Sequence, residues 1–144
     1  MDQIREWLYI GKYRETINVN LLNRYNISAM LLLAELVEHP GIESLYTAVE
    51  DGEPLPVDML RQGVDFVIKQ QQQGQTILVA CGAGISRSAS FAIAALKEIE
   101  NLSLLEAYQI VRTAHPESLP HFRLWNSLCD YYDEAIPWTE LDHS

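Results

Sequence analysis

The chain has 144 residues, of which 48% are hydrophobic and 21% charged, a composition that predicts one globular domain over residues 1–144. Ten basic and twenty acidic residues leave a net charge of −10, which argues against nucleic acid or an anionic membrane as the main partner. Two cysteines are too few for a disulfide scaffold, and the longest apolar runs fall short of the ~18 residues of a membrane span. Since no apolar signal segment opens the chain, we expect a cytoplasmic protein with reduced thiols.

Four segments have the composition of β-strands. In chain order they are Trp7–Ile10, Ser28–Leu33, Leu45–Val49 and Thr76–Ala80. The second and the fourth are nearly unbroken apolar runs, which is typical of strands that are covered on both faces.

Helical patterns lie between and after these strands. The expected helices are 56–72, 88–100, 103–115 and 120–132. Pro56 suits a first helical position, and Ser103 with Glu106 forms a capping box at the start of the third helix. Strands that alternate with helices, followed by a run of helices, predict an α/β fold, a single domain with a small, mainly parallel central sheet flanked by helices.

The segment from the fourth strand to the second helix carries the chemistry. The strand delivers Cys81, a loop of small residues follows, and Arg87 stands at the beginning of the helix. A tight loop with Gly82 and Gly84 can turn successive backbone N–H groups inward, and the helix adds the positive end of its dipole. The planar guanidinium of Arg87 can bind two phosphate oxygens, and the same positive field favours the thiolate of Cys81. One loop would thus bind a phosphate and ionise the nucleophile that attacks it.

Two other interpretations of this loop are weaker. A buried structural cysteine would leave the glycines and the arginine without a purpose. A dinucleotide-binding loop would need a third glycine where Arg87 stands, and the bulk and charge of arginine oppose close packing of helix on strand.

The loop resembles the signature of the cysteine-dependent protein phosphatases, and within them the dual-specificity phosphatases. That signature is His-Cys-x-x-Gly-x-x-Arg followed by Ser or Thr, and residues 80–88 read Ala-Cys-Gly-Ala-Gly-Ile-Ser-Arg-Ser. Residues 7–11 resemble the family's opening strand, 47–54 its general-acid loop and 120–125 its closing helix. The resemblance implies a phosphatase that uses no metal or cofactor.

The resemblance also implies a role for individual residues. Cys81 would attack phosphorus and form a phosphocysteine, and Asp51 would protonate the leaving oxygen and later deprotonate water. Ser88 would donate a hydrogen bond to the cysteine sulfur. Glu50 and Glu53 stay open as alternatives for the acid. The expected phosphate-binding residues are Gly82, Ala83, Gly84, Ile85, Ser86 and Arg87.

One position departs from the signature. Ala80 replaces the histidine that precedes the family's cysteine and helps to order the loop and tune the thiolate. Because the helix dipole, the loop amides and Arg87 remain, the departure implies a functioning but slower enzyme.

The expected substrates are phosphotyrosine and phosphoserine or phosphothreonine in proteins, because the chain is too short for the elements that deepen the pocket of tyrosine-only relatives. The absence of lysine from loop 82–86 and the net charge of −10 disfavour inositol lipids. The alternatives are a phosphate-recognition module without turnover, a phosphatase acting on a small-molecule phosphate, and a sulfur carrier or arsenate reductase.

Three expectations concern the remaining polar residues. The four histidines lack the spacing of a metal site, so we expect His115 and His121 in surface or loop positions. Cys129 falls in an apolar helical stripe and is expected in the core. The acidic segment 139–144 is expected to be a solvated end.

Overall fold

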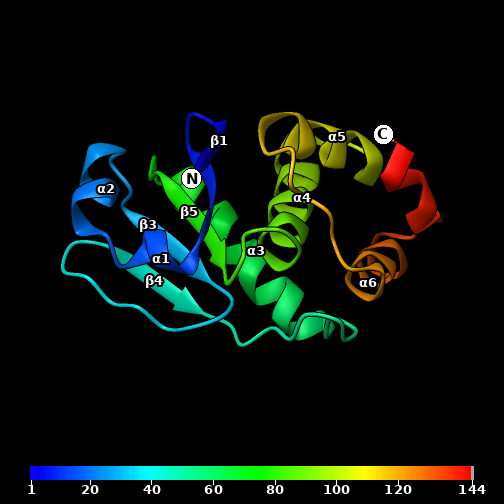
Figure 1. Ribbon diagram of the computed structural model, residues 1–144. Helices are drawn as coiled ribbons and strands as arrows, with labels where there is room; N and C mark the ends of the chain where they lie inside the picture. Colours follow the sequence, from blue (N-terminus) through cyan, green and yellow to red (C-terminus); the bar gives the residue numbers. More distant parts are fainter. Residues whose placement is uncertain (144) are drawn as a thin grey trace.

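A central β-sheet with helices on both faces forms the body of the computed structural model, which describes residues 1–143 (Figure 1). The strands are β1 Asp2–Arg5, β2 Leu8–Lys12, β3 Ala29–Leu32, β4 Glu43–Tyr46 and β5 Ile77–Cys81. The helices are α1 Tyr13–Thr16, α2 Val19–Arg24, α3 Val57–Gln72, α4 Arg87–Glu100, α5 Leu104–Ala114 and α6 Phe122–Tyr132, followed by the 3-10 helix η1 Trp138–His143. None of these helices is both long enough and apolar enough to cross a bilayer.

The order of the strands determines where the loops meet. The sheet runs β1-β2-β5-β3-β4, with β2, β5, β3 and β4 parallel to one another and β1 antiparallel to β2. This arrangement confirms the predicted α/β fold with a small, mainly parallel sheet. Because the four parallel strands end at one edge, the loops that follow them lie together there, which is the usual place for a ligand site in an α/β sheet.

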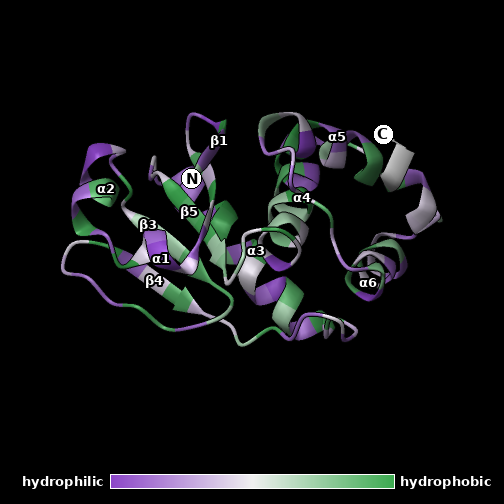
Figure 2. Cartoon of the chain, in the orientation of Figure 1, coloured by the Kyte–Doolittle hydropathy of each residue, from purple (hydrophilic) through white to green (hydrophobic). Residues whose placement is uncertain are grey.

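Strand β5 divides its side chains between two hydrophobic clusters. Ile77, Val79 and Cys81 belong to the larger core, which also contains side chains of α3 to α6. Leu78 and Ala80 belong to a smaller cluster that includes Leu22 of α2. This alternation is the period of two expected for a strand that is covered on both faces, and β5 is predominantly hydrophobic in Figure 2.

Helix α4 is the central helix of the larger core. Its residues from Ser88 to Leu96 are all buried, and it packs on α3, α5, α6 and two strands. On α3, Gly63 provides the space that this packing needs, because a Cβ there would lie 2.3 Å from Cε1 of Phe91. The ring of Phe91 therefore lies directly against the backbone of α3, and this close packing holds the beginning of α4 at the sheet edge.

The structure corrects several boundaries. Four short elements were not predicted, namely β1, α1, α2 and η1. The third predicted strand is displaced, because β4 pairs with β3 over residues 43–46 and the chain leaves the sheet at Thr47. Helix α4 begins at Arg87 rather than Ser88, and α6 begins at Phe122 rather than Pro120.

The expectation of a solvated C-terminal end is wrong for Leu141, although Thr139 and Glu140 are exposed. Leu141 is fully buried, and its carbonyl oxygen accepts hydrogen bonds from the Tyr108 hydroxyl at 3.1 Å and from Arg112 at 2.6 Å. A single buried leucine and its carbonyl are thus enough to fix an otherwise polar segment against α5. Ser144 lies outside the described residues.

Candidate active site

Cys81 ends strand β5 at the sheet edge where the parallel strands terminate. It is only 3% exposed. The backbone N–H of Gly84 donates a hydrogen bond to its sulfur at 3.3 Å, and the hydroxyl oxygen of Ser88 lies 3.3 Å from the same sulfur. Loop 82–86 therefore wraps around the sulfur, and the N-terminus of α4 follows directly after the loop. Polar hydrogens and a helix N-terminus around a sulfur favour its thiolate form.

Three carbonyl groups of this loop are held by donors from outside it. The backbone N–H of Tyr13 donates to the oxygen of Gly82 at 3.4 Å, and that of Leu119 donates to the oxygen of Ile85 at 3.1 Å. A ring nitrogen of His115 lies 2.6 Å from the oxygen of Gly84. In a trans peptide the C=O and the next N–H point in opposite directions, so these bonds turn the N–H groups of residues 83, 85 and 86 to the other side of the loop. Successive N–H groups on one side form a site for an anion.

The two glycines of the loop have close neighbours, and the backbone conformation requires glycine at position 84. Gly84 has a φ of +71°, and a Cβ there would lie 3.0 Å from the carbonyl oxygen of Gly11. At Gly82 a Cβ would lie 3.2 Å from Nη2 of Arg87. The loop therefore passes close to β2 on one side and to the guanidinium group on the other.

Arg87 connects loop 82–86, named the phosphate loop after its predicted role, with the loop that follows β4. Its side chain is half-buried, and Nη1 donates a hydrogen bond to the carbonyl oxygen of Val49 at 3.1 Å. This bond fixes the direction of the guanidinium group, with Nη2 close to Gly82. A guanidinium held in this way can bind two oxygens of a phosphate with its remaining N–H donors.

Asp51 lies in the loop after β4, is exposed, and reaches the phosphate loop through Ser86. The hydroxyl of Ser86 donates to Oδ1 of Asp51 at 2.8 Å, and it accepts a hydrogen bond from the N–H of His121 at 2.8 Å. One hydroxyl thus ties together the acidic loop, the phosphate loop and the segment before α6. The sequence predicted only a phosphate-binding backbone at Ser86, and nothing in its local pattern indicates this second connection.

Comparison with known proteins agrees with this geometry. The family model described as "Dual specificity phosphatase, catalytic domain" matches residues 8–134. The chain belongs to the dual specificity phosphatase family. It is 33% identical over 129 residues to human dual specificity protein phosphatase 16, covering 86% of this chain and 19% of that protein. It is 31% identical over 123 residues to dual specificity protein phosphatase 1 of Arabidopsis thaliana, covering 82% and 62% of the two chains.

A solved structure gives the same fold. A mouse dual specificity phosphatase complexed with zinc tungstate superimposes with a TM-score of 0.85 at 26% identity, covering 92% of this chain and 86% of that one. The chain therefore spans nearly the whole of this phosphatase structure, whereas it spans 19% and 62% of the length of the two relatives named above.

The structure brings the residues of the predicted phosphatase site together. Cys81, Ser88 and Arg87 surround the loop, and Asp51 adjoins it through Ser86. Glu50 and Glu53 are exposed on the same acidic loop as Asp51. Ala80, at the position of the family's histidine, is 2% exposed and packs in the smaller hydrophobic cluster on the α2 side of the sheet.

Both histidines lie in loop positions, which is one of the two expected places, but neither is an exposed surface residue. His115 follows α5, is 3% exposed and contacts both Asp2 and Gly84. His121 is half-buried and caps α6, since its ring accepts a hydrogen bond from the N–H of Arg123. The contacts of His115 could not be read from spacing along the chain, because its partners lie in distant segments.

A hollow of about 420 Å³ adjoins the phosphate loop. Its lining combines loop residues with side chains that the sequence analysis did not select; the lining residues are Lys12, Tyr13, Arg14, Gly82, Ala83, Ile85 and Glu117. The sequence carried one signal for this lining, namely the position of Lys12 at the end of β2. Because β2 and β5 are parallel neighbours, they end at the same edge of the sheet. The hollow offers space for the groups that flank a bound phosphate.

Proposed function

We propose that this chain hydrolyses phosphate monoesters on proteins through a phosphocysteine formed at Cys81. The observation that carries the proposal is the loop of residues 82–86, whose carbonyl groups are held from outside while its Gly84 N–H points at the sulfur. Membership of the dual specificity phosphatase family supports the same chemistry.

In the first step the thiolate of Cys81 attacks phosphorus. A sulfur–phosphorus bond forms while the bond to the ester oxygen breaks, and Asp51 gives its proton to the departing oxygen. The loop N–H groups and Arg87 bind the three equatorial phosphoryl oxygens, where the transition state carries its charge. The hydrogen bond from Ser86 holds the Asp51 carboxyl beside the loop.

In the second step water releases the phosphate. Asp51, now a carboxylate, takes a proton from the attacking water, the new oxygen–phosphorus bond forms, and the bond to sulfur breaks. Ser88, 3.3 Å from the sulfur, stabilises the departing thiolate with a hydrogen bond. Besides the substrate and one water molecule, these two steps use side chains and backbone N–H groups of this chain.

The substrates that we propose are phosphotyrosine and phosphoserine or phosphothreonine in proteins. Gly82, Ala83 and Ile85 of the loop are exposed, and Ile85 is 38% exposed, so the anion site lies close to the surface. A phosphate on a short side chain can reach such a site as well as one on tyrosine. We also propose a cytoplasmic location, because the reaction needs a reduced thiol at Cys81 and both cysteines are free.

A phosphate-recognition module without turnover is the weaker candidate. Such a module needs only the loop amides and Arg87, whereas this chain also places Cys81, Ser88 and Asp51 at the same loop. A module that only binds phosphate has no use for two polar groups at a cysteine sulfur. It also has no use for a carboxyl group that is tied to the loop.

The test is an assay of the purified chain with an aryl phosphate and with one peptide sequence phosphorylated in turn on tyrosine, serine and threonine. We expect turnover of all three peptides by the wild type and by Cys129→Ser, and none by Cys81→Ser. Phosphopeptide binding by the wild type without release of phosphate would favour the recognition module. Turnover by Cys81→Ser would contradict the assignment of the nucleophile, and turnover of a small phosphate ester alone would contradict the protein substrate.

A further inference from the structure

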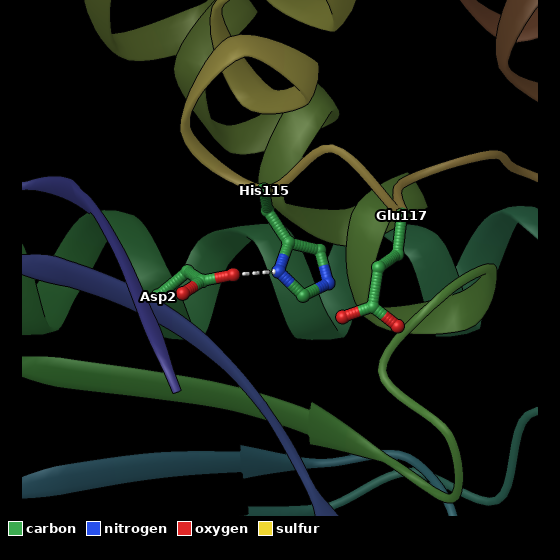
Figure 3. Close-up of side chains that lie close together, drawn as sticks. All are labelled: Asp2, His115 and Glu117. Atoms are coloured by element: carbon green, nitrogen blue, oxygen red, sulfur yellow. Dashed lines mark hydrogen bonds and ion pairs between the residues drawn. The ribbon is translucent and has the colours of Figure 1, made fainter.

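His115 is buried between the start of the chain and the phosphate loop. It follows α5, and its side chain is 4% exposed. One ring nitrogen, Nδ1, lies 2.5 Å from a carboxylate oxygen of Asp2 on β1, and the other, Nε2, lies 2.6 Å from the carbonyl oxygen of Gly84. Figure 3 shows the ring with Asp2 on one side and Glu117 on the other. Both nitrogens of a buried ring are therefore engaged.

The two partners fix the orientation of the ring. A carbonyl oxygen can only accept a hydrogen bond, so Nε2 donates to the oxygen of Gly84. At Nδ1 one proton is shared with the carboxyl group of Asp2, whose side chain is 43% exposed.

Several charged groups lie around the ring. Glu117 offers a carboxylate oxygen within 4.8 Å of the ligand atoms of His115 and Asp2, and Lys12 of β2 lies 4.0 Å from Glu117. The N-terminal ammonium group next to Asp2 is bound to Glu15 at 2.5 Å. On the loop side, the titratable group is Cys81, one hydrogen bond beyond Gly84.

The bond to Gly84 acts directly on the anion site. By holding the carbonyl of Gly84, the ring turns the N–H of Ile85, which belongs to the same peptide, toward the opposite side, where the phosphate binds. The N–H of Gly84 itself donates to the sulfur of Cys81. The ring of His115 thus contacts Gly84, the residue that connects the nucleophile with the phosphate-binding amides. Ala80, which stands where the family signature has a histidine, has only a methyl group and donates no hydrogen bond to the loop.

We propose that His115, oriented by Asp2, is a positioning residue for phosphate binding: it donates to the carbonyl of Gly84 and so orients the amide of Ile85. This inference rests on the proposed function, since it assigns the phosphate site to the same loop. It also assigns part of phosphate binding to a residue outside the family signature.

A metal ion is the competing occupant of this cluster. Asp2, His115 and Glu117 are close enough to share one ion. However, two ligand atoms that are each about 2.1 Å from an ion lie roughly 3 Å or more apart, and the observed 2.5 Å between Nδ1 and the Asp2 oxygen suits a shared proton instead. Binding of an ion at Nε2 would break the bond to Gly84.

The first measurement is binding of tungstate, a tetrahedral oxyanion like phosphate, to the folded protein. We expect His115→Leu to weaken tungstate binding ~10- to 100-fold, because it leaves the Gly84 carbonyl without a donor. His115→Gln keeps a donor of similar reach, so it restores part of the affinity. His39→Gln is the matched control, because His39 also contacts a backbone carbonyl, that of Thr16, at 2.6 Å.

The second measurement is the hydrogen bond from His115 to Gly84, by ¹⁵N NMR. We expect a proton on Nε2 of His115 that exchanges slowly with solvent in the wild type, because the ring is buried and Nε2 donates to the Gly84 carbonyl. Asp2→Asn keeps a hydrogen-bond acceptor for Nδ1, so we expect it to weaken tungstate binding less than His115→Leu does. Thermal unfolding of each variant confirms that it is folded.

The outcomes separate this inference from the proposed function. An Nε2 without a proton, unchanged tungstate affinity in His115→Leu, or one equivalent of zinc bound through His115 would overturn the inference, even in an active phosphatase. Conversely, a protein that binds tungstate in the expected His115-dependent way but turns over no phosphate ester would contradict only the proposed function.

Discussion

The two cysteines of this chain show that burial alone does not decide the character of a sulfur. Cys81 is the more deeply buried, yet its sulfur accepts a hydrogen bond from Gly84 and adjoins the hydroxyl of Ser88. Cys129 on α6 is half-buried, and its sulfur donates a hydrogen bond to the carbonyl oxygen of Ile136 at 3.6 Å.

The direction of these hydrogen bonds distinguishes the two sites. Burial raises the pKa of the Cys129 thiol, and the nearby carboxylates of Asp130 and Glu134 act in the same direction. At Cys81 the N–H of Gly84 and the N-terminus of α4 face the sulfur instead. The sulfur of Cys81 thus accepts a hydrogen bond, whereas that of Cys129 donates one to a carbonyl oxygen. The following predictions test this difference.

The largest effect on activity is expected at Arg87. Its guanidinium group is the feature of the Cys81 site that an ordinary buried cysteine lacks. Arg87→Lys keeps the charge but loses the planar fork and the fixed bond to Val49, so we expect kcat/KM for an aryl phosphate to fall about 10³-fold. Arg24→Lys, on the exposed end of α2, is the control and should leave kcat/KM unchanged. A loss smaller than about tenfold in Arg87→Lys would mean that lysine binds the phosphate equally well.

A smaller effect is expected at the general acid. Asp51→Asn should lower kcat/KM about 10²-fold for esters with poor leaving groups and less for activated aryl esters, because only the poor leaving group needs the proton. Steady-state rates over a series of leaving groups measure this dependence. Glu50→Gln and Glu53→Gln are the controls on the same loop, and a larger loss in either of them would move the acid away from Asp51.

The reactivity of the two thiols gives a direct comparison within one molecule. With iodoacetamide at pH 7 we expect Cys81 to be alkylated at least about tenfold faster than Cys129, because a raised pKa leaves Cys129 with less thiolate at any given pH. Alkylation of Cys129 should accelerate only as the pH rises toward that raised pKa. Peptide mapping by mass spectrometry follows both sites, and inorganic phosphate should protect Cys81 alone. Equal alkylation rates at Cys81 and Cys129 would contradict the proposed difference between the two sulfurs.

The smallest effect is expected from Cys129 itself. Cys129→Ala removes a sulfur that packs against the core, so we expect the free energy of unfolding in urea to fall by about 1 kcal/mol while kcat/KM changes less than about twofold. A large loss of activity in this variant, with little loss of stability, would give Cys129 a function that its surroundings do not suggest.

The part of the site that is local in sequence could be predicted. Cys81, the glycines and Arg87 lie within seven positions (81–87), and a strand, a loop and a helix start in that order bring them together by short-range geometry alone. The mainly parallel sheet could also be predicted from the sequence, because the apolar runs of β3 and β5 are typical of strands that are covered on both faces.

The remainder depends on contacts between segments that are far apart in the chain. The bond from His115 to Gly84 joins residues 31 positions apart, and those from Ser86 to Asp51 and to His121 each join residues 35 apart. Strand β1 was missed because its four residues, Asp-Gln-Ile-Arg, are mostly polar, and it forms only as an edge strand paired with β2. Such elements are specified by their partners rather than by their own composition.

The most direct test of the account is to trap the covalent intermediate. Wild type and Asp51→Asn are mixed with a ³²P-labelled aryl phosphate, quenched in acid within milliseconds to seconds and digested, and the labelled peptide is identified by mass spectrometry. The account predicts one acid-stable phosphoryl group on Cys81, formed before phosphate is released and absent from Cys81→Ser. Release of phosphate with no labelled peptide, or a label on any other residue, would contradict it.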